Sequence, residues 1–149
     1  MTDIVDMKTR SKMMAGIRAG NTIPEIQIRK FLFGHSFRYR LHYKKLHGRP
    51  DIVLPKYRVV IFVHGCFWHR HQGCKLSYAP KSNSEIWQLK FEKNIQRDKK
   101  QINALISEGW RVVVIWECGL RSHSPDLSWL PYEIRSGNMQ YSEWPNDNN

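Results

Sequence analysis

The sequence has no long hydrophobic run and is poor in acidic residues. No apolar stretch approaches the ~20 residues that a membrane-spanning helix needs, and the segment from Met1 to Gly16 lacks the apolar core of a secretory signal peptide. We therefore expect a cytoplasmic protein with no membrane-bound part. The chain has 13 Asp and Glu against 24 Lys and Arg, a net charge of +11. Such a charge favours a long phosphate polyanion as partner, although a merely basic protein is the alternative at this point.

Cysteine is also scarce, and no internal repeat is visible. The chain has three cysteines in 149 residues, and an odd number does not suit a secreted disulfide framework. The length fits one domain with its own core. We expect a basic N-terminal arm over residues 1–20 and a single domain over residues 21–149. From Ser122 onward the sequence predicts an irregular C-terminal tail.

Apolar patterning in the rest of the chain predicts alternating helices and strands. The helices are expected over residues 22–33 and 85–108, and the strands over residues 37–41, 51–54, 58–63 and 111–116. Thr22 suits the N-cap of the first helix, and Ile28 and Leu32 fall on its inward face. The apolar face of the second helix is expected to consist of Leu89, Ile95, Ile102, Leu105 and Ile106.

The strands over 51–54 and 58–63 are separated by three residues and should form an antiparallel hairpin. In this hairpin Asp51 faces about Phe62, and it therefore lies close to Val63 and His64. A carboxylate beside an imidazole at a sheet edge, in a basic protein, fits metal-assisted phosphodiester cleavage. The alternative is that Asp51 only caps the turn after Pro50.

The strands over 58–63 and 111–116 are joined by a long helix, so they should be parallel. Both then end at the same edge of the sheet, which brings Cys118 to the loop that carries Cys66 and Cys74. Three thiolates and one imidazole complete a tetrahedral, closed, structural zinc site. The spacing favours His71 as the fourth ligand, with His69 as the other candidate. Three unrelated reduced thiols are the alternative.

Several strings in the chain are together very specific. They are Gly48-Arg49-Pro50-Asp51, Val60-Ile61-Phe62-Val63-His64-Gly65-Cys66-Phe67-Trp68-His69, Asn94-Ile95-Gln96-Arg97-Asp98, Gly109-Trp110-Arg111-Val112 and Ile115-Trp116-Glu117-Cys118. With Thr9-Arg10-Ser11-Lys12-Met13-Met14, they make the chain resemble the very short patch repair (Vsr) endonucleases from about Asp6 through Arg121. One departure is an additional residue before Cys74, which Gly73 can accommodate because glycine relaxes a tight turn.

The resemblance implies a fold and an activity. The fold would be a restriction-endonuclease-like (PD-(D/E)XK-type) α/β domain with a mixed central sheet flanked by helices and a structural zinc site. The activity would be strand-specific nicking of DNA 5′ of the thymine in T·G mismatches, which arise when 5-methylcytosine deaminates. The nick would initiate very short patch repair. The enzyme would act as a monomer on bacterial nucleoid DNA, alongside a cytosine-C5 methyltransferase and mismatch-repair proteins.

The resemblance also implies roles for individual residues. Asp51 and the backbone carbonyl of Val63 would bind a catalytic Mg²⁺, His69 would activate the attacking water, and His64 would assist at the phosphate. Glu25 would support this site. The structural zinc ligands would be Cys66, His71, Cys74 and Cys118, and the side chains inserted into the DNA would be Phe67, Trp68, Trp87 and Met14.

Other residues are assigned no catalytic role. Asn94, Arg97 and Asp98 match a family string but are kept outside the catalytic set. The ordinary surface or structural histidines are expected to be His35, His42, His47 and His123. For the large aromatics, a place in the hydrophobic core is the alternative to contact with DNA.

Two other functions compete with the mismatch endonuclease. A double-strand restriction endonuclease of the same fold would cut fully paired DNA at a specific sequence. A non-catalytic zinc module would bind DNA without needing Mg²⁺, Asp51 or His69. The grouping of Asp51, His64 and His69 argues against the second rival.

Overall fold

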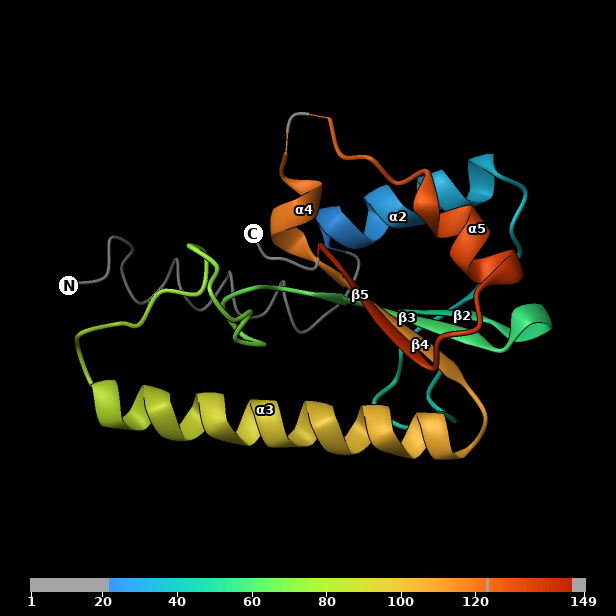
Figure 1. The fold of residues 1–149 in the computed structure, drawn as a ribbon. Coiled ribbons are helices and arrows are strands. Elements are labelled where there is room, and N and C mark those ends of the chain that lie inside the picture. The colour runs from blue at the N-terminus through green and yellow to red at the C-terminus, as the bar shows by residue number, and fades with distance from the viewer. Residues whose placement is uncertain (1–21, 123, 146–149) are drawn as a thin grey trace.

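The computed structural model describes residues 22–122 and 124–145. The expected arm over residues 1–20, including Met14, lies outside these described residues, as does His123. A five-stranded mixed sheet forms the centre of the described chain, in the order β1-β2-β3-β4-β5. Helix α3 covers one face of this sheet, and α2, α4 and α5 lie on the other (Figure 1). No helix in the described part is both long and apolar enough to cross a bilayer.

The first helix, α2 (Ile23–Gly34), begins as the sequence predicts. Thr22 is the N-cap, and a reciprocal capping box links it to Glu25, whose backbone N–H donates to the Thr22 hydroxyl. Ile28 and Leu32, one turn apart, are fully buried against the sheet. The capping box also fixes the Glu25 side chain at the start of the helix.

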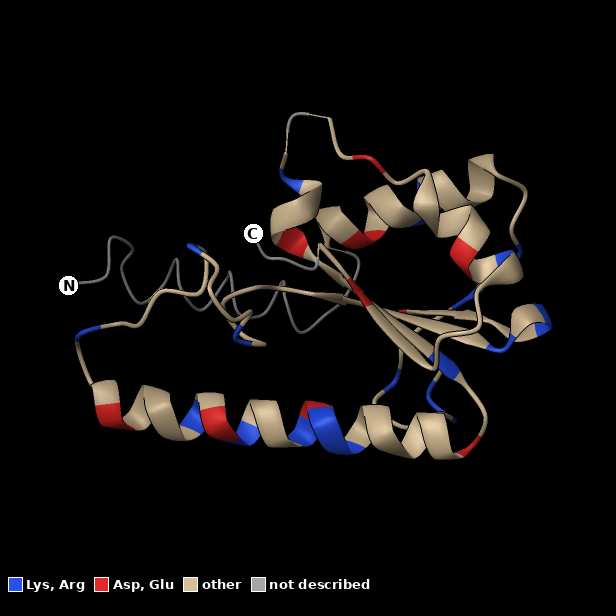
Figure 2. Cartoon of the chain, in the orientation of Figure 1, with Lys and Arg blue, Asp and Glu red and all other residues tan. Residues whose placement is uncertain are grey.

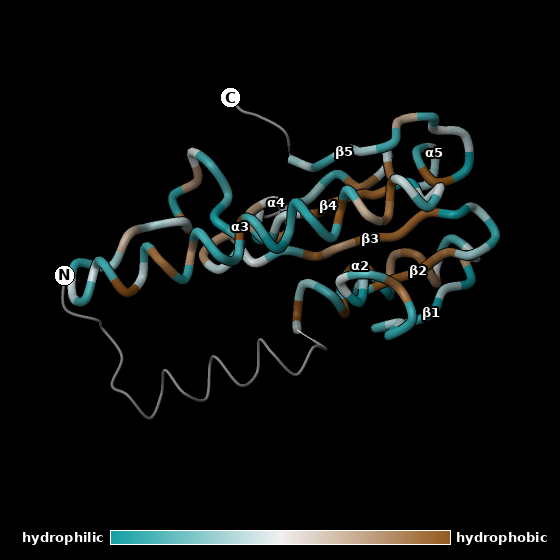
Figure 3. Tube along the Cα trace, turned by 90° about the horizontal axis from the view of Figure 1, so that it is seen from below, coloured by the Kyte–Doolittle hydropathy of each residue, from teal (hydrophilic) through white to brown (hydrophobic). Residues whose placement is uncertain are grey.

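The hairpin and the parallel pair are confirmed. β2 (Ile52–Leu54) pairs antiparallel with β3 (Val59–His64) through the short 3₁₀ turn η1 (Pro55–Tyr57), and β3 pairs parallel with β4 (Arg111–Trp116). Alternate residues of β3 pack on opposite faces, with Val59 and Ile61 toward α2 and Val60 and Phe62 toward α3. Figure 3 shows this hydrophobic stretch along β3. Burial on both faces explains the uninterrupted apolar sequence.

Helix α3 (Ser84–Ser107) corrects part of the sequence prediction. Its C-terminal half packs on the sheet through Leu105, but its N-terminal half runs past the sheet edge beside the loop that follows β3 (Figure 1). Leu89, expected on the inner face, is 63% exposed, whereas Phe91 is buried. The helix therefore changes its packing partner along its length, and a single apolar face cannot describe it.

Two further expectations were wrong. Strand β1 covers only Arg40–Leu41 rather than residues 37–41, because Phe37 turns into the core. The C-terminal segment is not irregular: it contains α5 (Trp129–Ser136) and β5 (Tyr141–Trp144), which pairs parallel with β4. Their short length and weak periodicity hid them, since the pairing of β5 depends on the already formed edge of β4.

Candidate functional site

Asp51 lies directly before β2 and contacts the end of β3. The pairing of Ile52 with Ile61 places Asp51 opposite Phe62, and the Val63 backbone N–H donates to Asp51 Oδ2 at 2.7 Å. The carboxylate is thus held by the neighbouring strand, as the hairpin geometry predicts, and not by the turn after Pro50. Burial, followed by the nearby Glu25 charge, raises the pKa of Asp51 to about 7. A cation would relieve this unfavourable burial of charge.

Glu25 and His42 complete a group of metal-ligating side chains with Asp51. Their ligand atoms all lie within 4.8 Å of one another. Glu25 is only 4% exposed, and its Oε1 lies 2.7 Å from His42 Nε2. His42 was expected to be an ordinary surface or structural histidine, and its place in this group was not predicted. It follows the two-residue strand β1, and only the pairing of that strand with β2 brings it to Asp51.

A second group lies at the end of β3 and joins two expected catalytic residues to one that was left outside the set. The rings of His64 and His69 stack with their centroids 3.8 Å apart. His69 Nδ1 donates to Asp98 Oδ2 at 2.6 Å, which leaves Nε2 as the basic nitrogen. Burial, together with the neighbouring His69, holds the pKa of His64 well below its usual value. His64 is therefore neutral at physiological pH.

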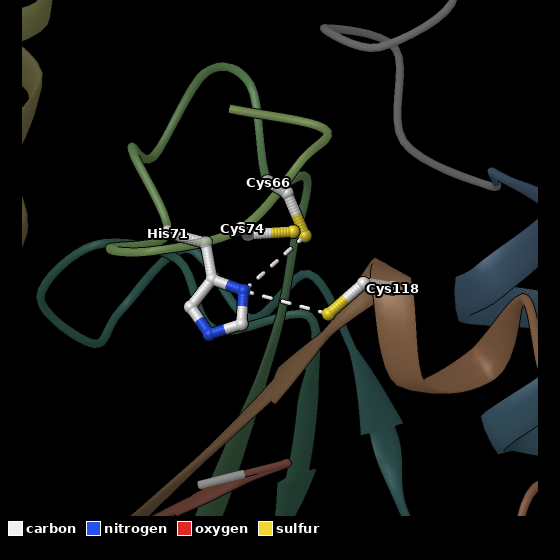
Figure 4. Close-up of side chains that lie close together, drawn as sticks. All are labelled: Cys66, His71, Cys74 and Cys118. Carbon is white, nitrogen blue, oxygen red and sulfur yellow. Dashed lines mark hydrogen bonds between the residues drawn. The ribbon is translucent and has the colours of Figure 1, made fainter. Parts of the chain in front are cut away.

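The three cysteines and His71 form a third group. The parallel register of His64 with Trp116 brings both strand ends to one edge, and Cys118 follows there in α4 (Glu117–Leu120). His71 Nδ1 lies 3.6 Å from Cys66 Sγ and 3.4 Å from Cys118 Sγ, and Cys74 Sγ completes the group (Figure 4). His69 belongs to the other group, so the geometry favours His71 of the two candidates.

The residue types of this cysteine–histidine group are those that structural zinc uses, and the group could hold a metal ion. Nitrogen and sulfur ligands of one tetrahedral zinc lie roughly 3.5–3.8 Å apart, close to the distances found here. Burial raises the pKa of the Cys66 and Cys118 thiols, so without a cation both are neutral. Metal coordination deprotonates such thiols. Gly73 has a positive φ of +75°, and this left-handed turn accommodates the additional residue before Cys74.

Trp116 lies between His71 of the cysteine–histidine group and His64 of the His64–His69–Asp98 group. Its ring stacks on His71 at 4.2 Å and meets His64 edge-on at 5.2 Å. The rings of His71, Trp116, His64 and His69 thus form one contiguous column from the cysteine group to the catalytic candidates. No local sequence signal predicts these ring contacts of Trp116, because they depend on the parallel register of β3 and β4.

The large aromatics form a cluster between the loop after β3 and the first part of α3. Phe67 lies 5.0 Å from Trp68 and 5.6 Å from Trp87, measured between ring centroids. Phe91 packs 5.3 Å from Phe67 and is the buried member, whereas Phe67, Trp68 and Trp87 are half-buried. The cluster lies outside both core layers of the sheet. It also touches exposed Tyr78.

The chain matches known proteins along most of its length. Residues 2–75 match the family model described as DNA mismatch endonuclease Vsr. The Type II nicking enzyme V.XorIIP of Xanthomonas oryzae is 48% identical over 136 residues, which cover 91% of this chain and 96% of that enzyme. This chain belongs to the Vsr family of DNA mismatch endonucleases.

Other Vsr relatives agree with this assignment. The Type II nicking enzyme V.NmeAIP of Neisseria meningitidis is 47% identical over 82% of this chain and 86% of its own length. The DNA mismatch endonuclease Vsr of Escherichia coli is 44% identical over 81% of this chain and 77% of its own length. The family resemblance seen in the sequence is therefore confirmed. The chain is a homologue of a DNA mismatch endonuclease.

Helix α3 of this Vsr-family chain carries five of the 24 lysines and arginines. Lysine and arginine positions recur along the middle of the helix and alternate there with acidic ones (Figure 2). Asp98 points inward to His69, while the adjacent Arg97 is more than half exposed. Asn94 Nδ2 donates to the Trp68 carbonyl at 3.1 Å. Residues that the sequence left without a role thus border the site.

Proposed function

We propose that this Vsr-family chain nicks one DNA strand 5′ of the thymine in T·G mismatches produced by deamination of 5-methylcytosine, and so initiates very short patch repair. One observation carries the proposal. The half-buried Asp51 carboxylate and the His69–Asp98 pair lie at the same sheet edge as an aromatic cluster that belongs to neither core layer. Residues suited to phosphodiester hydrolysis thus lie next to aromatic side chains that could contact bases.

Asp51 and the Val63 carbonyl would hold the catalytic Mg²⁺. The N–H and C=O of one strand residue point to the same neighbour, so the Val63 carbonyl shares the Asp51 side with its N–H. Mg²⁺ accepts one or two carboxylates and keeps its waters, which this donor set allows. When bound, the ion would neutralise charge on the scissile phosphate. Because Val63 acts through its backbone, its side chain is not critical.

His69 would act as the general base. Asp98 accepts its Nδ1–H and so fixes the tautomer that presents Nε2 as proton acceptor. Asp98 is therefore a positioning residue in this proposal. Buried, neutral His64 would hydrogen-bond at the phosphate, and Glu25 would support Asp51 from the start of α2.

Zinc would have a structural role and would not take part in the cut. Cys66, His71, Cys74 and Cys118 give four protein ligands and leave no position for water, as in closed structural sites. The zinc would fix the loop after β3 to the end of β4. That loop carries His69 on one side and Phe67 and Trp68 on the other, and stiffening it would serve both.

Phe67, Trp68 and Trp87 would insert into the base stack at the mismatch, and Met14 would approach from the N-terminal arm. Separating two stacked base pairs costs a few kcal/mol, and the cost is lowest at a mismatch. Insertion of these aromatic side chains would therefore itself favour mismatched over paired DNA. We expect Trp68→Ala to lose affinity for T·G DNA with little change in melting temperature. A large fall in melting temperature would instead assign Trp68 to the core.

The wider setting follows from the substrate. The mixed sheet, with Asp51 directly before β2 and against the end of β3, supports a restriction-endonuclease-like (PD-(D/E)XK-type) fold. The net charge of +11 suits duplex DNA. We further propose a cytoplasmic, nucleoid-associated monomer that works alongside a cytosine-C5 methyltransferase and mismatch-repair proteins.

The deciding experiment compares cleavage of T·G and fully paired duplexes, with each strand labelled, in the presence and absence of Mg²⁺. Nicking of only the thymine strand, abolished in Asp51→Ala while DNA binding persists, is the expected result. Double-strand cutting of paired DNA would favour a restriction endonuclease. An Asp51→Ala variant that still cuts would overturn the site.

A further inference from the structure

We propose that Arg70 is a positioning residue that holds the aromatic wedge of Phe67 and Trp68, and that it thereby sets the preference for mismatched over paired DNA. The inference rests on the proposed function, because it requires that these aromatics contact the mismatch. It adds a residue to which the family resemblance gave no role.

The Arg70 guanidinium ties together both ends of the wedge loop. Its Nη1 donates to the Phe67 carbonyl and to the Tyr78 carbonyl, each at 3.1 Å, and its Nη2 donates to the Ser77 carbonyl at 3.0 Å. One rigid group thus links the backbone of the wedge to a segment that follows Arg70 by seven and eight residues. Hydrogen bonds from a charged donor are stronger than neutral ones.

The same guanidinium joins the loop to α3. Its central carbon lies 3.7 Å from the ring centroid of Phe91 and 5.5 Å from that of Phe67. Phe91 is 3% exposed and packs on Phe67 and Trp87. A cation over a desolvated ring is worth more than one at an exposed site. Arg70 therefore connects the loop backbone, the wedge and the helix.

The backbone of Arg70 shows that these contacts determine its conformation. Its φ is +55°, a left-handed value that is uncommon for residues other than glycine. Such a conformation persists where surrounding contacts over-determine it. Lysine cannot replace this arrangement, because an ammonium lacks the planar fork that binds several carbonyls while stacking on a ring.

Arg70 acts on a different part of the loop from the cysteine group. Cys66 and His71, on either side of Arg70, bind the base of the loop to the end of β4 through Cys118. Arg70 binds the wedge backbone and the far segment at Ser77. The cysteine group would thus fix the position of the base of the loop. Arg70 would fix the orientation of Phe67 and Trp68 toward the DNA.

The test measures the ratio of dissociation constants for paired and T·G duplexes in wild type, Arg70→Lys and Trp68→Ala. Arg70→Lys keeps the charge, so we expect similar binding to paired DNA but a ratio reduced roughly tenfold, the equivalent of one lost charge-assisted contact. The rate of nicking at saturating T·G DNA is measured beside the ratio, and a slower rate with an unchanged ratio would overturn the inference and connect Arg70 with the neighbouring His69 instead. Lys81→Ala, a charge-removing control in an exposed position, should weaken both duplexes alike and leave the ratio unchanged.

Each outcome supports or overturns the role of Arg70. If Trp68→Ala loses discrimination and Arg70→Lys keeps it, the inference is wrong and the proposed wedge stands. If neither variant changes the ratio, both fail. Should Arg70→Lys not fold, Arg70→Gln decides in its place, since a planar amide can donate to one of the carbonyls but cannot span all three. A reduced ratio in Arg70→Gln supports the inference, and an unchanged ratio overturns it.

Discussion

The cysteine group provides the most quantitative prediction. If zinc binds its four members, it cross-links the loop after β3 to the start of α4. The closed loop is long, because His71 and Cys118 are 47 residues apart. We perturb it with Cys118→Ser, which removes the one ligand on the β4 side and leaves three on the loop.

The magnitude follows from loop closure. Closing a loop of this length lowers the entropy of the unfolded chain by an amount worth about 4 kcal/mol at 25 °C. For a domain of this size, 1 kcal/mol shifts the melting temperature by roughly 2–4 °C. We therefore expect Cys118→Ser to melt roughly 8–16 °C below wild type.

The assay is thermal unfolding followed by circular dichroism, with and without a strong zinc chelator, together with metal analysis of the purified proteins. The chelator should lower the wild-type melting temperature to that of Cys118→Ser and should not affect the variant. This comparison separates loss of the metal from loss of side-chain packing. If the wild type contains much less than one zinc per chain and the chelator changes nothing, the zinc assignment is refuted.

Three further changes test other parts of the structure. Thr22→Ala removes the N-cap of α2 and should cost about 1 kcal/mol in urea unfolding; no loss would mean that the capping box contributes nothing. Ile61→Ala, at a fully buried position in β3, should cost about 2–5 kcal/mol, against no more than ~0.5 kcal/mol for Lys81→Ala at the surface. Asp98→Asn should slow single-turnover nicking by about 10²–10⁴-fold, the usual contribution of a positioned base, while T·G affinity stays constant; an unchanged rate would exclude Asp98 from the mechanism.

The outcomes for the C-terminal half of the chain show where sequence reasoning stops. β4 was predicted with its bounds, because five consecutive apolar residues buried on both faces are a strong local signal. β5 was missed because Tyr141–Trp144 carries no comparable pattern and exists as a strand only by pairing with β4. Leu89 was misplaced because periodicity identifies a helix but not where the sheet beneath it ends.

The sequence by itself determined the elements whose patterns are local and the contacts that chain geometry imposes. The hairpin brought Asp51 to Val63, and the parallel pairing of the β–α–β unit brought Cys118 to Cys66. Only the tertiary structure decided which histidine joins the cysteines, paired His69 with Asp98, and brought His42 to Glu25. These are side-chain choices between elements distant in sequence, and they depend on register and packing, for which a single sequence carries no periodic signal.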